Sequence, residues 1–345
     1  MERNGQIMEK MKLGIVGFGF MGHCDADMMA TFDEIDLVAV ADTNPEQLKD
    51  APEGVETYGS IDEMLEKADI NVVMVSTPNP SHPEMVKKAA AAKKHVICEK
   101  PAAMSVAEFD EMVAACKENG VIFTVHQQRR WDTDYRIMKE VYDKNMVGDM
   151  YVIKSQLYGF NGNMHDWHVY PEMGGGMLYD WGVHLIDQML DMVKSDIVSL
   201  YADVQNVINE NVDDYFNIIM KFANGVTAEI ELGTYYLTPK RGWFIGGNEG
   251  KIVRTAHLLE NVPGKITMTA AGPTRSFGPA APGLLQEEAL PEVNVSHRMY
   301  FEHFLKAFNG EEDVIVKPEQ VRRVLCVMDA VRESARTGKA IEFEK

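Results

Sequence analysis

Two side chains suited to proton transfer, Asp180 and His184, lie four positions apart in the run GGGMLYDWGVHLID that begins at Gly174. A spacing of four places both on one face of a helical turn. Histidine has a pKa near neutrality and therefore suits general acid–base chemistry. The three glycines before this turn would let the backbone pass close to a ligand. The same residues would also fit a buried structural histidine with Asp180 as a helix cap.

A third candidate for chemistry is Lys100, in the triplet Glu99-Lys100-Pro101. The triplet follows the short apolar run His95 to Cys98, which predicts a buried strand. Ligands of open α/β sheets bind beyond the carboxyl ends of the strands, where Lys100 is expected. A lysine there can stabilise a developing alkoxide, or act as a base if it is desolvated. A solvated loop lysine is the alternative.

A glycine-rich turn supplies the nucleotide-binding signal. Residues 17–22 fit G-x-G-x-x-G, follow an apolar strand predicted at 12–17 and open a helix predicted at 20–31. The glycines would allow a tight turn, close approach to a pyrophosphate, and packing of helix on strand. Asp42 ends the next predicted strand, where a carboxylate binds ribose hydroxyls and repels a 2′-phosphate, so NAD is favoured over NADP. The predicted cofactor contacts in this turn are Gly17, Phe18, Gly19, Phe20 and Met21.

The order of predicted elements divides the chain into two domains. Up to residue 145, short apolar strands alternate with helices, which predicts a doubly wound parallel sheet. Beyond it, strands follow strands, and Asn224-Gly225 between two of them predicts a hairpin. We expect domains at 1–145, with residues 1–11 as a frayed leader, and at 146–345. A long irregular stretch is expected at 256–292, and helices at 297–309 and 318–336 are expected to pack back toward the first domain.

Composition excludes several classes of function. The formal net charge of −19 argues against binding nucleic acid or an anionic membrane. The four cysteines are far apart, so neither a disulfide framework nor a cysteine-based zinc site is expected. The chain shows no signal-peptide h-region and no apolar stretch long enough to span a membrane, which predicts a cytoplasmic protein.

Together, the G-x-G-x-x-G turn, the Glu99-Lys100-Pro101 triplet and the GG-x-x-x-D-x-G-x-H run resemble the glucose–fructose oxidoreductase, inositol dehydrogenase and MocA-type (Gfo/Idh/MocA) family. The similar layout covers residues 11–345, and both catalytic motifs keep the family pattern. The resemblance implies an N-terminal Rossmann domain and a C-terminal α+β domain with a large, open, mostly antiparallel sheet. It also implies a homo-dimer or homo-tetramer formed through that sheet.

The activity that the resemblance implies is NAD-dependent hydride transfer to or from a secondary alcohol carbon of a sugar, glycoside or cyclitol. Lys100 would lie near the nicotinamide, and Asp180 and His184 would complete the site. We expect His184 to be the base, with Lys100 as the alternative. A redox-neutral enzyme that cleaves or epimerises glycosides with bound NAD is a second possibility, and a non-catalytic NAD-bound regulatory protein is a third.

Further site residues follow from the resemblance and from residue chemistry, and no metal is expected. Trp167 suits a sugar face, and its polar neighbours suit hydroxyls; a metal at His165 and His168 is a weaker alternative because no third ligand is evident. Additional cofactor contacts are expected at Thr77, Pro78, Asn79, His82, Glu99 and Gln128. Substrate contacts are expected at Arg129, His165, Asp166, Trp167, His168 and Tyr235.

Overall fold

The computed structural model describes residues 2–3, 6–7, 10–160, 165–256, 265–269 and 285–343. The chain forms two compact units: unit 1 is Met1–Gln128 with His297–Leu325, and unit 2 is Arg129–Ser296 with Cys326–Lys345. The first boundary between the units lies between Gln128 and Arg129, before helix α5 (Thr133–Asp143), which packs within unit 2. The domain boundary near residue 145 stays a prediction. Among the described helices, none combines the length and apolar character needed to cross a bilayer.

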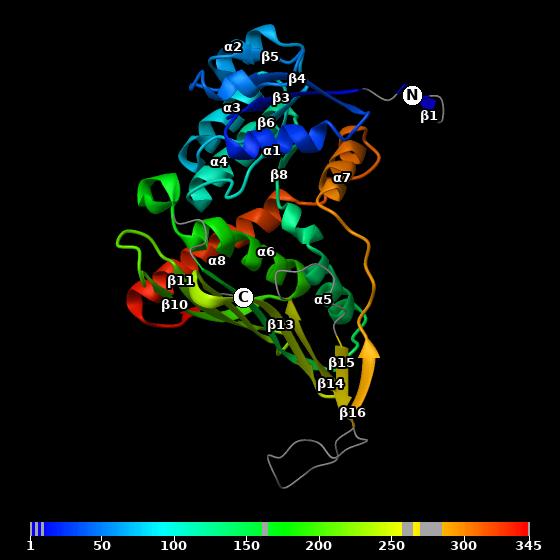
Figure 1. The fold of residues 1–345 in the computed structure, drawn as a ribbon, viewed down its shortest axis with the longest axis vertical. Helices are drawn as coiled ribbons and strands as arrows, with labels where there is room; N and C mark the ends of the chain where they lie inside the picture. Colours follow the sequence, from blue (N-terminus) through cyan, green and yellow to red (C-terminus); the bar gives the residue numbers. More distant parts are fainter. Residues whose placement is uncertain are drawn as a thin grey trace. The chain divides into compact units, whose positions relative to one another are not determined.

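Unit 1 is built on a six-stranded sheet in which every neighbouring pair is parallel (Figure 1). The strand order β5-β4-β3-β6-β7-β8 is that of a doubly wound nucleotide-binding sheet, with its switch point between β3 and β6. This confirms the predicted Rossmann architecture. The strands are β3 (Met11–Val16), β4 (Ile35–Ala41), β5 (Glu56–Tyr58), β6 (Val72–Val75), β7 (His95–Cys98) and β8 (Phe123–Val125).

The helices of unit 1 begin where the sequence provides caps. Ser60 accepts the backbone N–H of Glu63 at 3.2 Å, and Ser105 accepts that of Glu108 at 3.3 Å. A short 3₁₀ helix, η1 (Gln47–Asp50), follows β4. The other helices are α1 (Phe20–Met29), α2 (Ile61–Lys67), η2 (Asn79–Ser81), α3 (His82–Ala91) and α4 (Val106–Asn119).

Residues far along the chain complete unit 1. In helix α7 (Arg298–Phe308), the Arg298 guanidinium lies 3.5 Å from the ring centroid of Phe32. The same guanidinium donates to the Thr31 carbonyl at 2.7 Å. The Thr124 hydroxyl of β8 donates to the Val316 carbonyl at 2.9 Å. Helix α8 (Pro318–Thr337) follows.

Near the other end of the chain, two short strands precede β3, and the leader expected at residues 1–11 stays a prediction. Strands β1 (Glu2–Arg3) and β2 (Gln6–Ile7) pair with each other, and Met11, the first residue of β3, is fully buried.

Unit 2 contains a nine-stranded sheet in the order β16-β15-β14-β13-β9-β12-β11-β10-β17. All pairs are antiparallel except β9 with β12, which confirms the mostly antiparallel sheet. Two strands lie within the stretch expected to be irregular at 256–292, of which residues 257–264 and 270–284 lie outside the described part. The strands are β9 (Met150–Phe160), β10 (Ile197–Gln205), β11 (Tyr215–Phe222), β12 (Thr227–Gly233), β13 (Tyr235–Gly247), β14 (Gly250–Ala256), β15 (Lys265–Thr269), β16 (Leu285–Ala289) and β17 (Ile341–Glu342).

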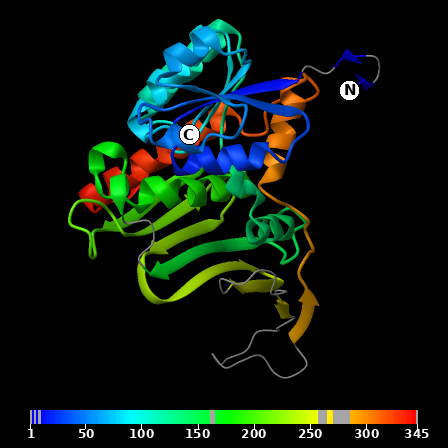
Figure 2. The same cartoon turned by 45° about the horizontal axis from the view of Figure 1, so that its top comes forward.

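The two faces of this sheet differ because side chains alternate along each strand. Phe216, Ile218 and Met220 of β11 are buried, whereas Ile219 between them is exposed. Helices α5 and α6 (Val183–Met192) lie along one face (Figure 2). The predicted hairpin at Asn224-Gly225 joins β11 to β12, with Gly225 at φ +90°. Shorter helices are η3 (Gln128–Trp131), η4 (Asp166–Val169), η5 (Pro171–Met173) and the π-helical turn η6 (Leu178–Gly182).

Candidate functional site

The glycine-rich turn joins β3 to α1, and its three glycines meet different surroundings. Gly17 has φ +87°, and a Cβ there would lie 2.6 Å from the backbone of Ser76 and Thr77, at the end of β6. A Cβ on Gly22 would lie 2.3 Å from the Gly17 carbonyl oxygen. A Cβ on Gly19 would meet no described protein atom within 4 Å. The outer glycines therefore serve packing, and the middle one borders open space.

This open space fits the pyrophosphate of a dinucleotide. Helix α1 starts directly after Gly19, with no side-chain cap and no acidic residue in its first turn. Its first N–H groups and positive dipole end therefore favour an anion. Phe20 and Met21 form this first turn, and the Phe20 side chain is exposed. Phe18 is buried, so its side chain anchors the turn.

Asp42 directly follows β4 and is held by the turn itself. Its Oδ2 accepts the N–H of Phe18 at 2.7 Å, and its Oδ1 accepts that of Asn44 at 2.7 Å. An ionised carboxylate has about four acceptor positions, so capacity remains for ribose hydroxyls. The contact with Phe18 links the predicted ribose site to the pyrophosphate turn.

The segments after β6 and β7 are joined by His82, which is completely buried. Its Nε2 lies 2.7 Å from the Thr77 carbonyl oxygen and its Nδ1 lies 3.0 Å from that of Pro101. Burial lowers the pKa of His82. His82 therefore links the segment after β6 to the segment after β7. Its direct contact with the cofactor stays a prediction. Asn79 is also buried, and Pro78 precedes it at the start of η2.

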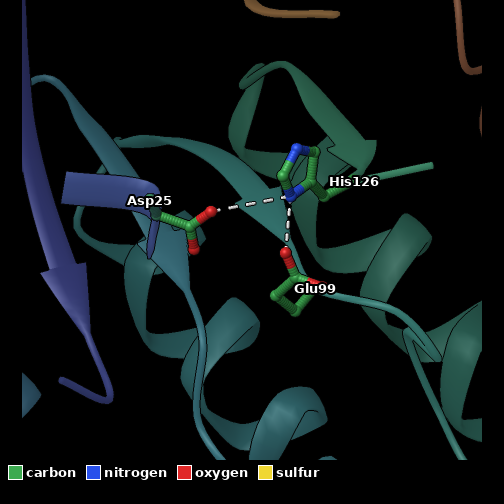
Figure 3. A group of neighbouring side chains, drawn as sticks. All are labelled: Asp25, Glu99 and His126. Carbon is green, nitrogen blue, oxygen red and sulfur yellow. Dashed lines mark hydrogen bonds and ion pairs between the residues drawn. The ribbon is translucent and has the colours of Figure 1, made fainter. Parts of the chain in front are cut away.

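Lys100 lies just beyond the carboxyl end of β7, where it was expected. The preceding Glu99 is buried, and its Oε2 accepts the backbone N–H of Lys100 at 3.1 Å. Its other oxygen, Oε1, lies 2.5 Å from Nδ1 of His126, and Oδ1 of Asp25 lies 3.8 Å from the same nitrogen (Figure 3). Sequence reasoning missed Asp25 and His126. Each is a single polar residue outside any motif, so no local pattern marks it.

Asp25, Glu99 and His126 form the one group of possible metal-ligating side chains found among the described residues, with ligand atoms within 4.8 Å of one another. Two ligands of a tetrahedral zinc ion lie about 3.4 Å apart, since metal–ligand distances are about 2.1 Å. Nδ1 of His126 and Oε1 of Glu99 lie 2.5 Å apart, closer than this separation and at the distance of a short hydrogen bond.

In unit 2, Asp180 and His184 lie on successive turns at the start of α6, and both are buried, with 7% and 3% of their surface exposed. Asp180 belongs to the π-helical turn η6, and His184 is the second residue of α6. Sequence reasoning expected an ordinary helical turn here. Single π-helical turns are rare and recur at functional sites, because they change where side chains point relative to a regular helix.

The glycines before this turn pack against protein, which corrects the interpretation that they make room for a ligand. A Cβ on Gly175 would lie 2.4 Å from the His168 carbonyl oxygen. Gly176 has φ +97°, and a Cβ there would lie 2.3 Å from Oδ1 of Asp213. Asp213 also accepts the N–H of Leu178 at 2.7 Å. Contacts with His168, seven residues before Gly175, and with Asp213, far along the chain, therefore hold the start of the run.

Asp213 is a second residue that sequence reasoning missed. Burial raises its pKa to about 6, against the opposing effect of backbone hydrogen bonds such as that of Leu178. The pair Asp213-Asp214 is visible in the sequence, but adjacent acidic residues are common on surfaces and indicate no site by themselves.

Arg129 reaches the same run through an aromatic ring. Its guanidinium carbon lies 4.0 Å from the ring centroid of Trp181, within cation–π range. The Trp181 ring lies 6.2 Å from that of His184. The carbonyl of Arg129 accepts a hydrogen bond from Gln188 of α6 at 2.6 Å. Arg129 is thus held against Trp181 and α6, and its contact with substrate stays a prediction.

The polar and aromatic residues predicted at 165–168 lie in a loop ending in η4. The rings of Trp167 and His168 stack at 3.8 Å, and His165 lies 2.8 Å from the Asp166 carboxylate. The loop contacts the run that begins at Gly174, because the His168 carbonyl accepts the N–H of Gly176 at 3.0 Å. Their contact with substrate, and the expected absence of a metal, stay predictions.

A pocket of about 390 Å³ in unit 2 contains Tyr235. Its volume is within the range of small-molecule sites. The N–H of Thr234 in the pocket wall donates to the Asp214 carbonyl at 3.2 Å. The adjacent Asp213 accepts the N–H of Leu178, so the segment 213–214 contacts both the pocket wall and the run that begins at Gly174. The lining residues are Gln205, Val207, Asp214, Tyr215, Gly233, Thr234, Tyr235 and Tyr236.

Gln128, the remaining predicted cofactor contact, follows β8 at the end of unit 1. Its Oε1 is buried and accepts no hydrogen bond within the part of the chain that the structure describes. An acceptor left in this state is costly, and a donor on a ligand, such as a carboxamide, would satisfy it.

Comparison with known proteins matches both halves of the chain. Residues 11–127 match an oxidoreductase family with an NAD-binding Rossmann fold, and residues 135–253 match the GFO/IDH/MocA C-terminal domain. A solved NAD-binding protein from Listeria innocua is 32% identical, with a TM-score of 0.87, over 96% of this chain and 97% of its own.

Two curated relatives are inositol dehydrogenases. The myo-inositol 2-dehydrogenase of Thermotoga maritima is 26% identical over 229 residues, which are 64% of this chain and 68% of the relative. The scyllo-inositol 2-dehydrogenase (NADP(+)) IolW of Bacillus subtilis is 24% identical over 358 residues, covering 98% of this chain and 97% of the relative.

Proposed function

Because the chain belongs to the Gfo/Idh/MocA family of NAD-dependent oxidoreductases, we propose that it oxidises a secondary alcohol carbon of a cyclitol, sugar or glycoside, or reduces the corresponding ketone. The observation that carries this proposal is the arrangement within unit 2. Asp180 and His184 lie beside the Arg129–Trp181 pair, and their run shares the segment 213–214 with a pocket containing Tyr235.

The pocket chemistry supports a polyol substrate. Tyr235 presents an aromatic face that can pack against the C–H face of a ring and a hydroxyl that can exchange hydrogen bonds with substrate. Tyr215, by contrast, already donates to Glu231 at 3.1 Å, and Tyr236 is stacked on Tyr158. Gln205 and Thr234 add further donors and acceptors. The two inositol dehydrogenases among the relatives favour a cyclitol as the first compound to test.

In the proposed mechanism, bound NAD would supply the acceptor for the hydride of the carbinol carbon. His184 removes the hydroxyl proton, since a neutral imidazole suits general-base work near neutrality. Lys100 donates a hydrogen bond to the developing alkoxide and stabilises its charge. Asp180 orients the His184 ring and the substrate hydroxyls. The roles of His184 and Lys100 as base are exchanged in the alternative form of the proposal.

We also propose that the protein forms a homo-dimer or homo-tetramer through the open face of the unit 2 sheet. Tyr201 and Ile219, which pair across β10 and β11, are exposed apolar residues on that face. Isologous association would bury them. Analytical ultracentrifugation of the protein and of Ile219→Lys tests this: a monomer in both would refute the proposal.

The test of the activity is a substrate panel. Purified protein is incubated with NAD and inositols, aldoses or aryl glucosides, and reduced nicotinamide is followed by absorbance. We expect a steady rise with one class, which Lys100→Met and His184→Ala abolish while NAD binding persists. The exposed α4 residue Lys117, changed to Met, is the matched control and should retain activity.

Other outcomes would replace the proposal. Consumption of substrate without net reduced nicotinamide would identify the redox-neutral enzyme, in which the hydride returns to the product. Loss of NAD binding in both Lys100→Met and His184→Ala would show that these residues are structural. No consumption of any panel compound by protein that binds NAD would favour the regulatory alternative.

A further inference from the structure

Three buried ionisable side chains meet within unit 1 (Figure 3). Asp25 comes from α1, Glu99 follows β7 and His126 follows β8. Nδ1 of His126 lies 2.5 Å from Oε1 of Glu99 and 3.8 Å from Oδ1 of Asp25. Each side chain has at most 5% of its surface exposed. Buried charged groups are costly unless they are paired, so this cluster needs a reason to exist.

The walls around the cluster fix the imidazole. The rings of Tyr300 and Phe301 of α7 lie 4.7 and 4.9 Å from that of His126. Nε2 of His126 is buried and makes no hydrogen bond to any described residue, so Nδ1 carries its polar contact. Ser76 donates to Oδ2 of Asp25 at 2.9 Å. The other titratable groups facing the cluster are Cys24, His82, Cys98, Lys100 and Tyr300.

The electrostatics favour an ion pair with a third group that carries a proton near neutrality. Burial raises the pKa of Glu99, but the attraction and hydrogen bond of His126 outweigh this and lower it. For His126 the same pair raises the pKa against the effect of burial. Burial, then repulsion by Glu99, raises the pKa of Asp25 to about 7. The charge of the cluster therefore changes near neutral pH.

The cluster is connected to the proposed catalytic lysine through the backbone. The Glu99 carboxylate bonds His126 with Oε1 and the Lys100 N–H with Oε2. Turning this carboxylate would break one of the two bonds. His126 and Asp25 can therefore affect Lys100 without touching substrate.

We propose that His126 and Asp25 are positioning residues: they hold the Glu99 carboxylate and, through it, the backbone of Lys100, and the charge on Asp25 couples this arrangement to pH. The inference rests on the role proposed for Lys100. A purely structural cluster would affect the stability of unit 1 but not the pH dependence or rate of the folded enzyme.

The first test uses two substitutions on one helix. Asp25→Asn keeps the shape of the side chain and removes its charge, while Asp27→Asn makes the same change at an exposed position of α1. We expect the pH profile of kcat between pH 6 and 8 to lose the Asp25 titration in Asp25→Asn. The profile of Asp27→Asn should superimpose on that of the unmodified enzyme. Identical profiles for all three proteins would overturn the coupling.

The second test changes the donor to Glu99. His126→Phe keeps a ring between Tyr300 and Phe301 but removes Nδ1, whereas the amide nitrogen of His126→Asn can take the place of Nδ1. We expect kcat of His126→Phe to fall roughly 10- to 100-fold, as for loss of a hydrogen bond to a charged group. His126→Asn should recover part of the loss, and KM for NAD should change less than kcat.

The outcomes separate this inference from the proposed function. If Lys100→Met remains active, the role of Lys100 fails first. If Lys100→Met is inactive but folded His126→Phe has the kcat of the unmodified enzyme, only the positioning role is overturned. A lower melting temperature of His126→Phe with unchanged kcat per folded molecule would likewise overturn it. A stoichiometric metal that purifies with the protein and is lost in Asp25→Asn would also overturn it.

Discussion

The glycine turn of unit 1 and the glycine run of unit 2 solve the same packing problem with different partners. Gly17 packs against the segment after β6, whose position follows directly from the strand order β3-β6. Gly175 and Gly176 pack against His168 of the 3₁₀ helix η4 and against Asp213 of the loop before β11. The first arrangement is set by the sheet, and the second by contacts between loops. Substitutions in the glycine turn of unit 1 should therefore lower the stability of the fold. Substitutions in the glycine run of unit 2 should displace the side chains of the proposed site.

The largest effect is expected from Gly17→Ala compared with Gly19→Ala. The methyl group at Gly17 would meet backbone at 2.6 Å at a φ of +87°, which costs about 3 kcal/mol or more. We expect a lower melting temperature and loss of NAD binding. Gly19→Ala should keep the melting temperature of the unmodified protein but weaken NAD binding, since its methyl group enters the open space. Thermal unfolding and nucleotide titration check both, and equal melting temperatures for the two variants would contradict the packing argument.

A smaller, more local effect is expected from Gly176→Ala. Its methyl group would meet the Asp213 carboxylate at 2.3 Å and displace the start of the catalytic run. A displacement of about 1 Å can reduce turnover roughly 100-fold, while NAD binding should persist. Gly225→Ala is the matched control, because it has a similar φ of +90° with no neighbour within 4 Å. Steady-state kinetics compares the two; similar losses in both would assign the effect to backbone strain alone.

Asp42→Asn should change cofactor preference without disturbing unit 2. Losing a charged acceptor for ribose hydroxyls costs roughly 10-fold or more in NAD affinity, and NADP should bind no worse, because the charge that repels its 2′-phosphate is gone. Asp36→Asn, at the start of the same strand, is the control. Fluorescence titration of both nucleotides measures the ratio. A parallel loss for NAD and NADP would remove Asp42 from the ribose site.

The smallest effect concerns the pH dependence of stability at Asp213. Its pKa in the folded protein is raised to about 6 from 3.8, so the folded state holds a proton that the unfolded state has released. Stability therefore falls as the pH rises, by on the order of 1 kcal/mol between pH 5 and 7. The difference in melting temperature between the unmodified protein and Asp213→Asn should shift by a few degrees in favour of the variant over this interval. A constant difference would show that Asp213 is ionised throughout.

The sequence predicted unit 1 well because its signals are local. The β3 strand and the α1 helix each depend on neighbouring residues, and each lies within two residues of its expected bounds. Lys100 could be placed because a strand end precedes it.

Unit 2 was harder to predict because its contacts join distant segments. The parallel pairing of β9 with β12 places Ser155 opposite Ile230, and nothing in either strand specifies that partner. The π-helical turn, the Asp213 contacts and the cluster of Asp25 with His126 likewise depend on tertiary packing. Residue types identified candidates there, but only the folded chain shows their neighbours.

The discontinuity of unit 1 has a consequence for the order in which the protein is made. Helix α7 covers Phe32 and His126, yet in the chain it follows every strand of the unit 2 sheet except β17. During synthesis, the first 128 residues must therefore wait for nearly the entire polypeptide before those aromatic surfaces are covered. A ribosome-bound chain halted before residue 297 would expose them, and this exposure makes it a candidate client for chaperones.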